Sequence, residues 1–223
     1  MKRDGSNDSF NNYFLDAYTA PTRKNWVLDG WYTSGTPRVK VLNADGTIAN
    51  GNAAGYTKDG KFDLTGDQKL YARWTRWKFE PVSFPTGGGT IAIGSVNGNT
   101  LYIMKVSGTS SIGVQTIDNA LNESGVYYLE KLPTTDPMEW TVAGRNNSYS
   151  FKIGNGSYLR RNGTSLILGN EASWTVSNNQ VYQTSSYIFT FYLTVNGAGA
   201  SAELYSPFNL TFFQIGEVDV YDG

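Results

Sequence analysis

The sequence predicts an all-β protein, and two observations lead to this prediction. Aromatic residues make up 14% of the 223-residue chain and charged residues only 17%. This composition is typical of β-sheets, because aromatic and β-branched side chains pack well on a pleated surface. Asn-Gly, Asp-Gly and Gly-Asn pairs recur along the chain and tolerate the positive φ angles of tight hairpins. Strands are expected at 26–31, 38–42, 70–74, 90–93, 100–106, 125–129, 140–142, 149–153, 165–168, 174–176, 187–195 and 210–215.

Charge and the missing residue types exclude several classes of function. With 18 basic and 19 acidic residues, the chain lacks the positive charge of a nucleic-acid-binding protein. It contains no His and no Cys, which excludes Ser-His-Asp and Cys-His nucleophiles, the usual zinc sites, iron–sulfur clusters and disulfides. No stretch approaches the roughly 20 apolar residues that span a membrane. We therefore expect no cofactor, no bound metal and no membrane insertion of this fragment.

The distribution of charge predicts two domains. Residues 1–76 carry 11 basic and 8 acidic side chains, a net charge of +3, whereas residues 77–223 carry 7 and 11, a net charge of −4. Near the change of sign, prolines and a Gly-Gly-Gly run interrupt the chain. We expect a first domain at 1–76, a linker at 77–89 and a second domain at 90–223. A weak attraction between the two halves, screened by salt, is also expected.

The last strand expected in the first domain has two distinct faces. Leu70, Ala72 and Trp74 share one face, whereas Tyr71 and Arg73 share the other. Together with the tryptophans of the first strand, the apolar face predicts a small core over about 65 residues. A domain of that size is marginally stable alone and usually occurs in arrays or fused to a partner.

A longer motif surrounds these residues. It comprises Pro21-Thr22-Arg23, Trp26, Gly30-Trp31-Tyr32 and Leu70-Tyr71-Ala72-Arg73-Trp74-Thr75, in this order. The motif resembles the Listeria–Bacteroides repeat, the B-repeat of internalin-type surface proteins, over about residues 13–76. The resemblance implies a small β-grasp-like module at the cell surface or cell wall of a bacterium, within a longer multidomain chain. Trp26 stands where the family has Tyr. The strand before Pro21 is reduced to about 13–18, so the module is truncated or completed by a neighbour.

Three segments of the second half have similar sequence patterns. Each reads strand, turn, strand with an aromatic-Leu step, turn and strand, and the steps lie at Leu101-Tyr102, Tyr158-Leu159 and Tyr192-Leu193. The extra length of the first segment lies in an insertion at 119–137. Three repeats of about 40 residues with four strands each are what a β-trefoil requires. The rhythm resembles ricin-type and fascin-type trefoils, without the Gln-x-Trp motif of the ricin type. We expect a β-trefoil-like domain, with a β-sandwich as the alternative.

Carboxylates are the main candidates for catalysis in a chain of this composition. A glycosidase needs two of them about 5–10 Å apart. No candidate lies in a recognisable catalytic motif, so we expect solvated surface positions and no enzyme. The candidates are Glu123, Glu130, Glu139, Glu171 and Glu203.

Aromatic and basic residues near expected turns are the candidate binding residues. Tyrosine faces stack on pyranose rings, and neighbouring amides bind the hydroxyls; core packing is the other explanation for each tyrosine. Two arginines on an expected hairpin tip are a solvated edge or a contact for an anionic glycan. The candidates are Tyr127, Tyr128, Arg160, Arg161, Tyr187 and Tyr205.

Together these observations favour a non-catalytic adhesion or binding protein, secreted or attached to a bacterial surface. Its expected partner is a glycan or another ligand on a host or cell-wall surface, bound weakly by the second domain. The alternative is a structural spacer that displays other domains, and a third class is an accessory region of a hydrolase. Low charge and the tyrosines near turns favour uncharged polar ligands.

Overall fold

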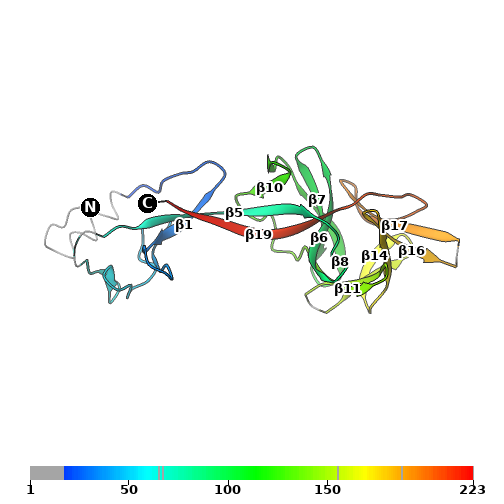
Figure 1. The fold of residues 1–223 in the computed structure, drawn as a ribbon, viewed down its shortest axis with the longest axis horizontal. Helices are drawn as coiled ribbons and strands as arrows, with labels where there is room; N and C mark the ends of the chain where they lie inside the picture. Colours follow the sequence, from blue (N-terminus) through cyan, green and yellow to red (C-terminus); the bar gives the residue numbers. More distant parts are fainter. Residues whose placement is uncertain (1–17, 65, 67, 155, 187, 223) are drawn as a thin grey trace. The chain divides into compact units, whose positions relative to one another are not determined.

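The computed structural model describes residues 18–64, 66, 68–154, 156–186 and 188–222. No helix occurs among them, and strands account for 59% of the structure, which confirms the all-β prediction (Figure 1). Every expected strand overlaps an observed one. The reduced strand expected at 13–18 lies almost wholly outside the described residues.

The chain forms two compact units, each described by itself below. One contains residues 1–76 together with 217–223, and the other contains residues 77–216. The sequence analysis placed 217–223 in the second domain, whereas their contacts are with the first. Residues 77–89 were expected to form a linker, but a strand continues through them as far as Val82. Phe79 within this strand is fully buried. Prolines suggested a linker there, but Pro81 is exposed near the strand end, where a missing N–H is tolerated.

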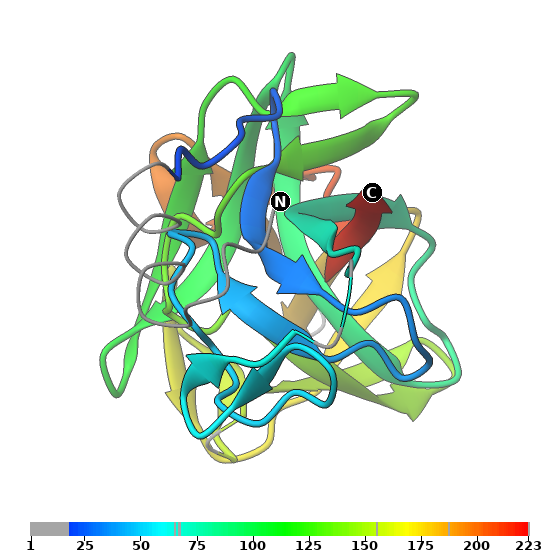
Figure 2. The same cartoon turned by 90° about the vertical axis from the view of Figure 1, so that its left-hand side faces the viewer.

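The first unit is built on an antiparallel sheet whose two central strands are β1 and β5. β2 pairs with β1, and β19 pairs with the other side of β5. β3 and β4 form a separate hairpin, drawn in cyan in Figure 2. The strands are β1 (Val27–Tyr32), β2 (Lys40–Asn43), β3 (Thr57–Lys58), β4 (Lys61–Phe62), β5 (Tyr71–Val82) and β19 (Thr211–Asp222), of which β5 and β19 also contribute residues to the second unit.

The alternation expected along β5 is present. Trp74 is 5% exposed and packs with Leu28 and Ala72, whereas Tyr71 and Arg73 are half-buried. Trp31 is half-buried too, and its indole N–H donates to the Tyr18 hydroxyl at 2.9 Å. A second small core lies around β2 and the β3–β4 hairpin.

Among its described residues, the second unit contains thirteen complete strands. They are β6 (Gly89–Asn97), β7 (Thr100–Ser107), β8 (Ser111–Ile117), β9 (Leu121–Glu123), β10 (Val126–Leu129), β11 (Glu139–Arg145), β12 (Ser148–Lys152), β13 (Tyr158–Asn162), β14 (Ser165–Gly169), β15 (Trp174–Ser177), β16 (Gln180–Ser185), β17 (Phe189–Asn196) and β18 (Gly199–Leu204). Seven of them close a barrel in the order β6, β7, β8, β14, β13, β12 and β11. The strands β15 to β18 continue as a meander from β12.

The pairings also repeat along the chain in sets of four strands. In the first set, β6 pairs with β7 and β11, and β7 forms a hairpin with β8. In the second set, β12 pairs with β13 and β15, and β13 forms a hairpin with β14. In the third, β16 pairs with β17, and β17 forms a hairpin with β18. The third strands β8, β14 and β18 contact one another. The β9–β10 hairpin, inside the expected insertion 119–137, lies outside this scheme and pairs with β5.

Candidate functional site

The structure separates the tyrosines predicted to bind ligand. Tyr127 is only 8% exposed and packs edge-on against Phe213, with ring centroids 6.5 Å apart. Its neighbour Tyr128 is half-buried in the same strand, β10. Tyr187 lies outside the described residues. Tyr205 is 56% exposed. Core packing therefore explains Tyr127, whereas Tyr205 has the exposure that a binding residue needs.

The two predicted arginines lie on β13, and both are half-buried. The guanidinium of Arg161 lies 3.7 Å from the ring centroid of Phe191 and donates from Nη1 to the Gly163 carbonyl at 2.7 Å. A guanidinium held flat on an aromatic ring covers apolar surface as much as it presents charge. Arg161 therefore contributes to the packing of the hairpins.

A cluster of exposed apolar side chains, here called the hairpin-end cluster, lies where β17 begins and β18 ends. Its members are Ile188, Phe189, Leu204 and Tyr205, which are the large hydrophobic side chains found exposed among the described residues. The Phe189 and Tyr205 rings are stacked, with an interplanar angle of 30° and centroids 6.3 Å apart. The Tyr205 hydroxyl donates to the Ile188 carbonyl.

The backbone holds this cluster in place. The N–H of Tyr205 donates to the Thr190 carbonyl at 2.9 Å, which extends the β17–β18 ladder by one position. Tyr205 then adopts a φ of 52°, a left-handed conformation that is uncommon for a residue other than glycine. Such strain occurs where surrounding contacts determine the conformation, and it is frequent at ligand-binding positions.

A second feature of the same strands is a cross-strand row, here called the tyrosine row: Thr175, Tyr182, Tyr192 and Glu203 on β15, β16, β17 and β18. Register places Thr175 opposite Tyr182, Tyr182 opposite Tyr192, and Tyr192 opposite Glu203. The tyrosine rings have centroids 5.3 Å apart and are tilted by 40°. Residues directly opposite in an antiparallel sheet point to the same face, so this row forms one continuous surface.

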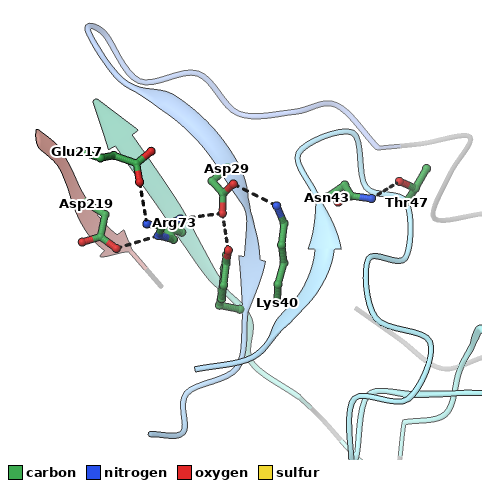
Figure 3. A network of polar contacts seen from close by, with 8 residues as sticks. Asp29, Lys40, Asn43, Thr47, Arg73, Glu217 and Asp219 are labelled. Carbon is green, nitrogen blue, oxygen red and sulfur yellow. Dashed lines mark hydrogen bonds and ion pairs between the residues drawn. The ribbon is translucent and has the colours of Figure 1, made fainter. Parts of the chain in front are cut away.

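The first unit carries a polar network on the exposed face of its sheet (Figure 3). Arg73 donates to three carboxylates: from Nε to Asp219 at 2.8 Å, from Nη1 to Asp29 at 3.2 Å and from Nη2 to Glu217 at 3.3 Å. Lys40 reaches the second oxygen of Asp29 at 3.1 Å. These carboxylates therefore pair with cations of the same unit.

The network shifts the pKa of several groups. Burial opposes ionisation of Asp29, but hydrogen bonds from Tyr32, Lys40 and Arg73 outweigh it and lower the pKa of its carboxyl. Burial and the hydrogen bond to the Asp29 carboxylate raise the pKa of Tyr32 to about 12. The pKa of Arg73 is raised, because its carboxylate partners outweigh its burial. All three shifts fix charge states that hold the sheet together.

The carboxylates considered for catalysis are all exposed. Glu171 accepts a hydrogen bond from Ser150 Oγ at 2.9 Å, and Glu203 accepts one from Ser201 Oγ at 2.6 Å. Partial burial raises the pKa of Glu139. Within the described ranges, no group of three potential metal ligands comes together, and no helix is long and apolar enough to cross a membrane. The five candidates are Glu123, Glu130, Glu139, Glu171 and Glu203.

Comparison of the chain with protein-family models, with curated proteins and with solved structures gives no match. The hairpin-end cluster and the tyrosine row are therefore identified as the candidate site from their geometry alone. Of its members, the sequence analysis selected Tyr205 but missed Phe189, Tyr182 and Tyr192. Strand alternation was the available signal, since Tyr192 is followed directly by the core residue Leu193.

Proposed function

We propose that this protein is a non-catalytic binding protein whose second unit binds neutral glycans through the hairpin-end cluster. One observation carries the proposal: the exposed large apolar side chains of the described chain gather at one hairpin end, and two of them are stacked aromatic rings. An exposed apolar patch on a folded protein usually marks an interaction site. Aromatic rings offer flat apolar faces to the C–H groups of a pyranose.

The polarity of the surroundings favours an uncharged polar ligand. Thr184 and Thr190 lie opposite each other beside the cluster, with hydroxyl oxygens 3.3 Å apart. Ser185 faces Phe189 across the β16–β17 pair. Hydroxyl groups both donate and accept hydrogen bonds, as sugar hydroxyls do. The second unit, residues 77–216, carries 7 basic and 8 acidic residues, a net charge of −1, so it has no general attraction for anionic ligands.

The strand pairings support a β-trefoil-like architecture for this unit, as part of the proposal. Two sets of four strands share one pairing scheme, and the third follows it up to the hairpin. A hydrogen bond from Leu210 N–H to Asn179 O, 2.8 Å long, links the two ends of the third set. If each set presents a shallow site, single-site affinity is modest and multivalency strengthens binding.

The first unit is proposed to be a B-repeat-like module at the bacterial cell surface. Its motif residues support a structural role, since Trp74 lies in the core and Arg73 in a closed network of ion pairs. A pure spacer, with no ligand of its own, is the competing function for the whole chain.

The test is calorimetric titration of the full chain with neutral oligosaccharides. Phe189→Ala and Tyr205→Ala should each weaken binding by about tenfold or more, because each removes one of the two stacked rings. Tyr158→Ala is the matched control, a half-buried tyrosine on β13, and should bind as the parent does. A parent chain that binds no member of a broad panel would leave the spacer as the better function.

A further inference from the structure

We infer that the tyrosine row is a second glycan subsite, which binds a pyranose carrying a free vicinal diol; this inference rests on the proposed glycan binding. The row lies on the face of the β15–β18 meander that points away from the core, where Glu203 is exposed and the other three residues are half-buried. Each of its residues on β16, β17 and β18 is adjacent in sequence to a fully buried residue, namely Val181, Leu193 or Ala202. Alternation along the strands therefore turns Tyr182, Tyr192 and Glu203 away from the core.

The two tyrosines form the apolar part of the subsite. Their rings lie on adjacent strands and are tilted by 40° to each other, and both residues are half-buried. Among the described residues, neither hydroxyl has a protein hydrogen-bond partner. A tyrosine in this state offers a ring to the C–H face of a sugar and a hydroxyl to its rim.

Glu203 supplies the polar end of the row. Its Oε1 accepts a hydrogen bond from Ser201 Oγ at 2.6 Å, which orients the carboxylate. An ionised carboxylate has two oxygens with about four acceptor sites. It can therefore accept hydrogen bonds from two neighbouring hydroxyl groups of one sugar ring. The same negative charge disfavours sulfated, phosphorylated and uronic ligands.

The dimensions suit an oligosaccharide rather than a single sugar. Four adjacent strands with a spacing of about 4.8 Å extend over roughly 14 Å. Along β17, Thr190 precedes Tyr192 by two positions and shares its face, and the N–H of Tyr205 donates to the Thr190 carbonyl. Both sites therefore lie on the β17–β18 pair, but Phe189, an odd number of positions from Tyr192, belongs to the opposite face of β17.

The experiment is calorimetric titration of the full chain with cellohexaose, xylohexaose and chitohexaose. The first two carry free vicinal diols on each inner ring, whereas an acetamido group replaces one of these hydroxyls in chitohexaose. We expect tighter binding of the two diol sugars. Glu203→Gln should weaken that binding by about tenfold, because it replaces one charged acceptor by a donor. Tyr192→Ala should weaken it similarly, and Tyr192→Phe should weaken it less.

Glu171→Gln is the matched control. Glu171 is an exposed glutamate that accepts a serine hydrogen bond just as Glu203 does, but it lies outside the row. Its replacement should leave binding unchanged. If Tyr205→Ala abolishes binding while Glu203→Gln and Tyr192→Ala do not alter it, the second subsite is wrong and the proposed function stands. Equal binding of chitohexaose overturns the diol preference. Failure of every sugar to bind the parent chain overturns the proposed function itself.

Discussion

At the scale of single residues, Asp29 and Tyr32 show how the first unit couples protonation to folding. The pKa of Tyr32 lies near 12 in the folded chain, above the ordinary value of 10.0. The neutral hydroxyl therefore contributes stability that is fully present below about pH 10 and is lost as the pH rises toward 12. The pKa of Asp29 is lowered instead, so its contribution is present above its ordinary pKa and is lost in acid.

Replacing Asp29 by Asn should move the pKa of Tyr32 back toward 10, because the charged hydrogen-bond acceptor is removed. Tyrosinate absorbance during alkaline titration measures this shift. Subtracting the titration of Tyr32→Phe from that of the parent identifies the signal of this one residue. A Tyr32 signal that keeps its midpoint in Asp29→Asn would mean that burial alone determines the pKa.

At the scale of elements, the end of β19 completes the sheet of the first unit and changes its net charge. Its acidic residues Glu217, Asp219 and Asp222 cancel the net charge of +3 carried by residues 1–76. Two of them pair with Arg73, and Asp222 pairs with Arg23 at 2.7 Å. Most of the acidic excess assigned to the second half of the sequence thus belongs to the first unit.

Replacing these three acids together by Gln and Asn should destabilise the first unit by about 1–2 kcal/mol, since exposed ion pairs contribute at most about 1 kcal/mol each. Thermal unfolding at low and high salt measures the loss, which should shrink as salt screens the pairs. Asp118, Glu130 and Glu171, neutralised together in the second unit, provide a charge-matched control. A loss independent of salt would assign the effect to packing rather than to charge.

The elements also show why sequence alone predicted some strands and missed others. Leu101, Ile103 and Val106 make β7 evident from its own residues. In contrast, β18 reads Gly-Ala-Ser-Ala-Glu-Leu, and its small residues have little strand preference until β17 pairs with them. Tyr192 and Glu203 became a candidate site only through that pairing, because they are eleven positions apart in the sequence.

At the scale of the whole molecule, the division into two units predicts that their backbone amides differ in protection against hydrogen exchange. Trp74 lies in the core of the first unit at 5% exposure, so Trp74→Ala should cost about 3–5 kcal/mol there. Trp31, which the sequence analysis placed in the same core, is half-buried, so Trp31→Ala should destabilise the first unit by less. The first unit contains residues 217–223, which no local pattern assigned to it, because partner segments distant in sequence leave no periodic signal.

Amide hydrogen exchange read by mass spectrometry measures this division. In Trp74→Ala, peptides from β1 and peptides covering 217–222 should lose protection together, whereas peptides around Trp140 in the second unit should keep theirs. Loss of protection in all of these peptides at once would show a single cooperative molecule. Protection of 217–222 that is unchanged while β1 opens would remove that segment from the first unit.

The use of a distant strand has a consequence for synthesis on the ribosome. Proteins emerge from their amino end, and domains generally fold in that order. Here residues 1–76 emerge early, but the outer strand of their sheet, residues 217–222 of β19, is synthesised much later. Until then, one edge of β5 keeps unpaired backbone groups, the kind of template on which nascent chains associate. The first unit is therefore completed only after the second unit, and a chaperone or a slow stretch of translation would act during that interval.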